Sequence, residues 1–154
     1  MNFGSDFLRS IDVLTLLPQR RPFVMIDHLT AIDEVTTVTT LLVTPDNIFA
    51  EGDRLNPCSM VEIIAQTCAA RMGFMNKYIY HNEVKLGFIG SIRNLCLTRA
   101  PRMGETLTTS IRIIEEVMQL TLVEATVMAG EETVATAEMK IAISDICAKM
   151  EESR

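Results

Sequence analysis

The chain has no tryptophan, two histidines and four cysteines among its 154 residues. The cysteines, Cys58, Cys68, Cys96 and Cys147, show no closely spaced pair, which favours reduced thiols over a disulfide framework or a zinc site. No apolar run approaches the length of a membrane span, and the first residues lack the basic-then-apolar pattern of a signal peptide. We therefore expect a cytoplasmic protein with no metal and no other cofactor.

Basic residues are in the minority, 14 against 20 acidic residues, which gives a net charge of −6. This balance disfavours binding to nucleic acid or to an anionic membrane surface. Hydrophobic residues make up 48% and charged residues 22%, as in an ordinary globular protein. The length fits one domain, so we predict a single domain over residues 1–154, with a core at about 10–144 and a charged tail at 145–154.

What the chain does have is an almost wholly apolar segment that begins after Pro57. We predict a helix from Ser59 to about Lys77, and because it is apolar nearly all round, we expect it to be buried on most sides. Two polar residues, Glu62 and Gln66, interrupt it on one face. A carboxylate in such a helix is costly to bury unless a partner or a reaction uses it. Glu62 is therefore the first candidate for chemistry.

The rest of the chain is mostly strand. A short helix is predicted at 7–17, closed by Pro18, and a polar loop at 45–57. Strands are predicted at 23–32, 35–44, 85–97, 105–114, 120–128 and 133–143. One antiparallel sheet wrapped around one long helix, an α+β arrangement, explains why the helix is apolar all round. A single sheet cannot cover every side of that helix, so we expect at least a dimer.

Six short motifs follow one another in the order and spacing of a known family. They read LPQRRPFVMID from Leu17, NIF from Asn47, VEIIAQ from Val61, GFIGSI from Gly87, RAPRMGE from Arg99 and ATAEM from Ala135. Together they resemble the 3-hydroxyacyl-acyl-carrier-protein dehydratases, a family with the hot-dog fold. The resemblance implies an antiparallel sheet wrapped around the central helix, and a substrate that is an acyl thioester of acyl carrier protein.

The departures from the family pattern fall on the chemistry. The family carries Gly-His-Phe-Pro-Gly before the helix, and its histidine does acid–base work. Here the loop at 51–57 reads EGDRLNP, which is shorter, and Asp53 falls where the histidine would align. Gln19 replaces the histidine of the opening motif, and Cys58 replaces the glycine before the helix. A subset of hot-dog proteins associated with polyene-type biosynthetic clusters is similar in its short, histidine-free loop.

Two interpretations of Glu62 stay open. Dehydration of a 3-hydroxyacyl thioester needs a base for the C2 proton and an acid for the leaving hydroxyl, and Glu62 near a helix N-terminus can fill one role. Alternatively, Ser59-x-x-Glu62 is a capping box that satisfies a helix-start amide. Gln66, one turn later, either orients the carboxylate and touches substrate or is a buried amide at a subunit contact. Ala69 and Gly73 share this face and allow close backbone approach.

Other candidates lie around the start of the helix. The backbone amides of Cys58 and Ser59 are candidates to hold the thioester oxygen as enolate character develops. A nucleophilic role for the Cys58 thiol is disfavoured, because no histidine lies nearby in the sequence. Asp53 is a weak candidate to replace the missing histidine, since a solvated loop does not raise the pKa of a carboxyl group. His28 and His81 do not align with the catalytic position, and we expect both to be structural.

The resemblance also implies binding residues on two later segments. The strand that lines the family's acyl tunnel corresponds to GFIGSI, and its candidate substrate contacts are Phe88, Ile89 and Gly90. Arg93, Arg99 and Arg102 concentrate positive charge on one strand and its turn. Acyl carrier proteins are acidic, so this basic rim fits a docking role. Solvated surface charge is the alternative for each arginine taken alone.

Three functions follow from these observations. The favoured one is a dehydratase, a lyase of fatty-acid or polyene-type biosynthesis, with Glu62 as its catalytic group. The second is a thioesterase that uses Glu62 without a histidine. The third is a non-catalytic partner subunit. In the family, the histidine of one subunit faces the carboxylate of the other, so Glu62 would complete a site with a histidine-bearing relative. Homodimer and heterodimer both stay open, as do the acyl-chain length and the pathway.

Overall fold

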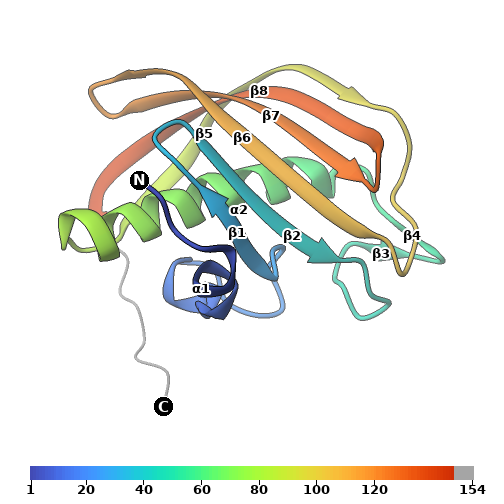
Figure 1. Cartoon of the computed structure of the whole chain (residues 1–154). Helices are drawn as coiled ribbons and strands as arrows, with labels where there is room; N and C mark the ends of the chain where they lie inside the picture. The colour runs from blue at the N-terminus through green and yellow to red at the C-terminus, as the bar shows by residue number, and fades with distance from the viewer. Residues whose placement is uncertain (148–154) are drawn as a thin grey trace.

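The computed structural model describes residues 1–147 as one curled sheet with a long helix along its concave side (Figure 1). The six strands lie in the order β1-β2-β6-β7-β8-β5, and every neighbouring pair is antiparallel. Their bounds are β1 His28–Ile32, β2 Thr36–Leu42, β5 Lys85–Leu97, β6 Thr106–Val117, β7 Leu120–Ala129 and β8 Glu132–Cys147. A separate small hairpin is formed by β3, Ala50–Glu51, and β4, Arg54–Leu55.

The long helix α2 spans Ser59–Phe74 and continues as a π-helix, η2, over Met75–Tyr80. Ten of the sixteen residues of α2 are buried, which confirms a helix enclosed on most sides. The chain leaves the helix at His81, whose φ of 55° lies in the left-handed region. The predicted end at about Lys77 therefore falls inside the π-helical extension.

Helix α2 packs tightly against the N-terminal segment at Gly73. That segment holds α1, Ser5–Ser10, and a 3-10 turn, η1, Val13–Thr15. A Cβ atom at Gly73 would lie 2.1 Å from the backbone carbonyl oxygen of Leu16, so only glycine fits there. Gly73 therefore serves a close contact within the chain.

The core has two parts. The larger cluster lies between α2 and the sheet and includes Ile63, Ile64 and Val127, all with 1% exposure or less. The smaller one joins α1, β1 and the end of α2 through Leu8, Leu29 and Phe74. Among the described residues, no helix has both the length and the hydropathy needed to cross a membrane.

Most predicted strands form, with shifted ends. The strand predicted at 85–97 coincides with β5. The strand predicted at 23–32 is wrong over residues 23–27, and the backbone of Phe23 and Met25 bonds to the Gln66 side chain instead. The helix predicted at 7–17 is divided into α1 and η1. Strand β8 takes in residues 145–147 of the predicted tail, whereas 148–154 lie outside the described residues.

The two edges of the sheet differ. Strand β1 has five residues and packs against α1, whereas β5 has thirteen. No described strand pairs with the outer edge of β5. Its exposed apolar side chains are Phe88, Ile89, Ile92, Leu95 and Leu97. A long edge strand with exposed apolar side chains is a ready template for pairing with another chain.

Candidate functional site

Glu62 and Gln66 form a fixed pair on the first turns of α2. The Gln66 side chain donates through Nε2 to Glu62 Oε1 at 2.7 Å and to the Phe23 carbonyl at 2.8 Å. Gln66 Oε1 accepts from the Met25 backbone amide at 2.6 Å. Gln66 is fully buried, whereas Glu62 is half-buried. Because a buried amide keeps its partners, Gln66 holds the carboxylate in one position.

One carboxylate oxygen of Glu62 has no hydrogen-bond partner among the described residues. Oε1 receives the hydrogen bond from Gln66, and Oε2 accepts none from any described residue. Glu62 also forms no ion pair with the part of the chain that the structure describes. The site therefore presents one oxygen, in a fixed and half-buried position, to a hydroxyl or another proton donor. Acid–base chemistry requires a group placed in this way.

The capping box predicted at the start of α2 does not form. Ser59 Oγ donates to the Asn56 carbonyl at 2.6 Å, and Glu62 pairs with Gln66 instead of the helix-start backbone. The Asn56 side chain accepts from the Cys58 amide at 2.8 Å, and its carbonyl accepts from the Ser59 amide at 3.0 Å. In the single chain Asn56 accepts from both amides, so a thioester oxygen would have to replace these bonds, and the predicted role of Cys58 and Ser59 stays a prediction. Asn56 was not singled out from the sequence, although asparagine before a helix is a common capping residue.

Asp53 lies in the turn between β3 and β4, next to Gly52 with its φ of 60°. Its side chain is exposed, and its backbone carbonyl accepts from the Met103 amide at 3.0 Å. No described residue forms a hydrogen bond or an ion pair with its carboxylate. These are the features of a hairpin-turn aspartate, so its role as a replacement for histidine rests on the alignment alone.

Neither histidine is joined to Glu62. His28 is exposed on β1, at the sheet edge opposite β5. His81 is exposed beyond η2, at the far end of the helix, about 28 Å from Glu62 at the rise of 1.5 Å per residue of a helix. Within the described residues, the site consists of a carboxylate and an amide without a histidine partner.

The three arginines proposed for docking have different surroundings. Arg99 Nη2 lies 2.9 Å from Glu105 Oε2 and 2.8 Å from Glu132 Oε2. These carboxylates raise the pKa of Arg99 above its usual range, and Arg99 lowers the pKa of both glutamates. Arg93 on β5 and Arg102 in the following turn are exposed, and neither guanidinium forms an ion pair with a described residue. Arg93 and Arg102 are thus the ones available to an acidic partner.

The predicted substrate contacts Phe88, Ile89 and Gly90 all lie on the open edge strand β5. Phe88 is 56% exposed and Ile89 is 41% exposed. In the single chain these side chains meet solvent. A substrate contact at these positions therefore needs a second chain to enclose it.

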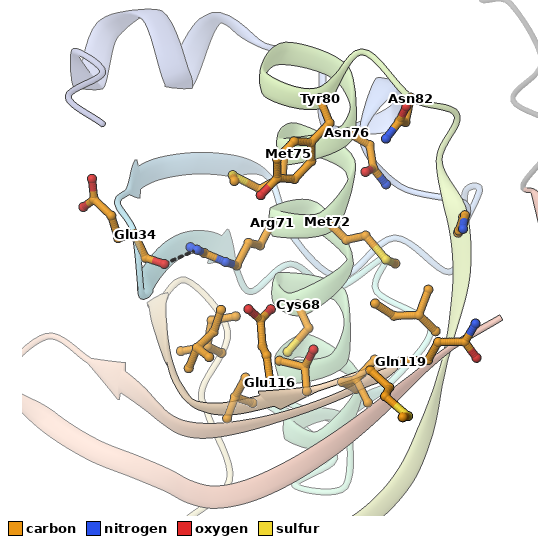
Figure 2. A pocket seen from close by; sticks show the side chains of 18 of the residues that line it. Glu34, Cys68, Arg71, Met72, Met75, Asn76, Tyr80, Asn82, Glu116 and Gln119 are labelled. Carbon is orange, nitrogen blue, oxygen red and sulfur yellow. Dashed lines mark hydrogen bonds between the residues drawn. The ribbon is translucent and has the colours of Figure 1, made fainter. Parts of the chain in front are cut away.

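Arg71 was not singled out from the sequence, although it is the only charged residue of α2 besides Glu62. Its guanidinium donates to the backbone carbonyls of Asp33, Glu34 and Thr36 and to the Thr37 hydroxyl, over 2.6–3.3 Å. Figure 2 shows the bond to Glu34. These acceptors lie in and just after the turn between β1 and β2, so Arg71 fastens the helix to that turn. The available signal was a lone arginine in an apolar stretch, where a buried charge requires partners.

The described residues contain no group of three histidine, cysteine, aspartate or glutamate side chains arranged to hold a metal ion. The thiols of Cys58, Cys68 and Cys96 are free. Burial raises the pKa of Cys68 to about 12, so this thiol stays protonated near neutral pH.

Comparison with known proteins gives a family match over most of the chain. Residues 11–151 match the profile of the ApeP-like family, described as ApeP dehydratase. The chain is also 25% identical over 138 residues to 3-hydroxyacyl-[acyl-carrier-protein] dehydratase FabZ of Clostridioides difficile (strain 630). That match covers 86% of this chain and 94% of the relative.

Solved structures share the fold. The dehydratase heterocomplex ApeI:P from Xenorhabdus doucetiae matches with a TM-score of 0.83 and 17% identity, over 89% of this chain and 93% of that one. The PaaI protein of the E. coli phenylacetic acid degradation operon matches with a TM-score of 0.59 and 16% identity, over 74% of this chain and 80% of that one. The predicted hot-dog fold is confirmed.

Proposed function

The chain belongs to the ApeP-like dehydratase family, and from this premise we propose that it supplies Glu62 to a two-chain site that dehydrates 3-hydroxyacyl thioesters on acyl carrier protein. The observation that carries the proposal is the Glu62–Gln66 pair, a fixed carboxylate with one oxygen that no described residue bonds and with no histidine bonded to it. The FabZ relative, whose name states this substrate class, supports the choice of reaction.

Loss of water from a 3-hydroxyacyl thioester requires two proton movements. A base takes the C2 proton, and the electron pair left at C2 becomes the C2=C3 double bond. The C3–O bond breaks, and the departing hydroxyl gains a proton and leaves as water. Glu62 donates a proton from Oε2 to the departing hydroxyl, while Gln66 holds the carboxyl group through the other oxygen. A histidine of a second chain takes the C2 proton. After water has left, the proton that was taken from C2 returns to Glu62, so that the net reaction is the loss of one water.

The second chain is a histidine-bearing hot-dog subunit that pairs with β5. The outer edge of β5 has no strand partner within the described chain and carries five exposed apolar side chains, which is the composition of a surface that another chain covers. Its pairing would also enclose Phe88, Ile89 and Gly90 against the acyl chain. The heterocomplex formed by ApeI:P supports an assembly of two different subunits.

The acidic carrier protein docks on Arg93 and Arg102. Both guanidinium groups are exposed without an ion-pair partner among the described residues, so they can exchange water for the carboxylates of the carrier. Arg99 contributes indirectly. It donates two hydrogen bonds to Glu105, and Glu105 Oε1 also accepts from the Arg102 backbone amide at 3.0 Å, which fixes the turn that carries Arg102.

The experiment is intact-mass spectrometry of a 3-hydroxyacyl carrier protein incubated with the purified chain, with a histidine-bearing subunit, and with both. We expect the carrier-bound substrate to lose one water when the two chains are mixed. Either chain alone should give no water loss, or a rate at least tenfold lower. Equal rates for the mixture and the partner alone would contradict the two-chain site. Loss of the whole acyl group with this chain alone would show a thioesterase, and loss of water with this chain alone would show a complete dehydratase.

A further inference from the structure

A cavity of about 510 Å³ lies beside the second half of α2 and the start of its π-helical extension, against the inner face of β6, β7 and β8 (Figure 2). Its volume is that of an ordinary small-molecule site. Glu62 and Gln66 do not line it, so it is separate from the site described above. Its apolar walls include Cys68, Met72, Ile111, Ile113, Val123 and Ile141.

One cation lies in this apolar wall. Arg71 is 8% exposed, and burial lowers its pKa below the usual range, yet an arginine keeps its charge in proteins. No described carboxylate lies within 4 Å of its guanidinium, which donates only to uncharged oxygens through Nη1 and Nη2. Its Nε–H donates to none of the described residues. The positive charge is therefore solvated by dipoles but not neutralised.

The other charges around the cavity leave an excess of positive charge. Glu34 is paired with the N-terminal amine at 2.6 Å. Lys85 and Glu116 also line the cavity and are of opposite sign. Glu116 is exposed, and although its field raises the pKa of Arg71, it forms no ion pair with it. Arg71 is thus the buried charge of the cavity, and the Glu116 carboxylate points toward it from the exposed side without forming an ion pair (Figure 2).

We propose that this cavity is a second binding site, and that it takes an amphipathic monocarboxylate. The carboxylate accepts hydrogen bonds from the Nε edge of Arg71, since a guanidinium fork matches a carboxylate. The apolar body of the ligand lies against Met72, Ile113 and Val123. The flexible thioether of methionine adapts to chains of different shape. The proposal does not depend on the dehydration proposed above.

The probe is octanoate, with octanamide as the matched neutral compound of the same chain. The full-length chain is labelled with carbon-13 at its methionine methyl groups and titrated by NMR. Met72 and Met118 line the cavity, whereas Met25 and Met60 are fully buried outside its lining. We expect saturable shifts at Met72 and Met118 with octanoate, and at least tenfold weaker binding of octanamide.

Two results of the titration would overturn the proposal. Equal affinity for octanamide and octanoate would show that the carboxylate is not recognised. Shifts confined to Met25 and Met60, or no saturable shift at any methionine, would show that octanoate does not bind in the cavity.

Variants place the ligand within the cavity. Arg71→Lys keeps a positive charge but loses the fork, and should weaken octanoate binding about tenfold, while Arg112→Lys on the outside of β6 should leave it unchanged. If Arg71→Lys does not fold, Ile113→Trp fills the cavity without touching the Arg71 bonds and should abolish binding. Unchanged affinity in Ile113→Trp would contradict the site.

Discussion

The two halves of α2 each hold one charged side chain in an otherwise apolar helix, and the surroundings of the two charges differ. Glu62 is half-buried, with one oxygen bonded by Gln66 and the other without a described partner. Arg71 is almost fully buried, and four oxygens of the β1–β2 region surround its guanidinium. Glu62 therefore presents an unused oxygen at an accessible position, where it can exchange protons, whereas Arg71 holds the β1–β2 turn with its two Nη atoms and keeps only its Nε edge for a ligand.

The largest effect on stability should come from a change that shifts helix α2 as a whole. Gly73→Ala places a methyl carbon 2.1 Å from the Leu16 carbonyl oxygen, so the helix must shift, at a cost of about 3 kcal/mol in the free energy of unfolding. Urea denaturation measures this cost. Gly4→Ala is the matched control, because its methyl group meets no atom within 4 Å. Equal stability of the two variants would contradict the close packing at Gly73.

The next largest effect should come from Arg71. Arg71→Met keeps the apolar stem but leaves the carbonyls of the β1–β2 turn without their donor, which should lower the free energy of unfolding by about 2–3 kcal/mol. Arg112→Met, at an exposed position, should cost less than about 0.5 kcal/mol in the same urea titration. If both variants lose the same amount, Arg71 does not fasten the turn.

Gln66 should have a smaller effect on stability and a larger one on chemistry. Gln66→Leu removes the partner of Glu62, Phe23 and Met25 and should cost about 2 kcal/mol in the free energy of unfolding. It should also slow dehydration by the mixed subunits, because the carboxylate is no longer held. Circular dichroism and the mass assay test the two effects. An unchanged dehydration rate in a folded Gln66→Leu variant would show that Gln66 has no role in the reaction.

The smallest effect should be a pH dependence of stability that comes from Asp33, in the turn that Arg71 bonds. Hydrogen bonds from the Val35 and Thr36 amides lower the pKa of Asp33 below its ordinary value of 3.8. The unfolded chain takes up this proton first as pH falls, so the stabilisation is complete above about pH 4 and disappears below the folded pKa. The Tm difference between wild type and Asp33→Asn should therefore shrink on acidification. A difference that stays constant from pH 6 to pH 2 would contradict this contribution.

The sequence pattern predicted what depends on local periodicity. The apolar surface of α2, the span of β5 and the i, i+4 proximity of Glu62 and Gln66 all follow from spacing along the chain. The pattern failed where a partner comes from far away or where two local options compete. Arg71 bonds residues 34 to 38 positions earlier, and Asn56 takes the capping role that Ser59-x-x-Glu62 offered. Periodicity carries no information on such distant pairs.

The cytoplasmic location, the roles of Asp53, Phe88, Ile89 and Gly90, and carrier-protein docking by Arg93 and Arg102 stay predictions. The three arginines can be compared as docking residues. Arg99 is bonded to Glu105 and Glu132, whereas Arg93 and Arg102 are exposed. Substitution of Arg93 and Arg102 should weaken binding of the carrier protein, and the difference from the wild-type chain should shrink as the salt concentration rises.

The decisive measurement is the rate of water loss from a 3-hydroxyacyl carrier protein, followed by intact mass, in a mixture of a histidine-bearing subunit with either the wild-type chain or Glu62→Gln. The substitution keeps a side chain that still bonds Gln66, so the two mixtures should assemble equally, as size-exclusion chromatography will verify. We predict a rate at least 100-fold lower with Glu62→Gln, the loss expected when an acid–base group is removed. Equal rates from two fully assembled mixtures would show that Glu62 takes no part in the reaction.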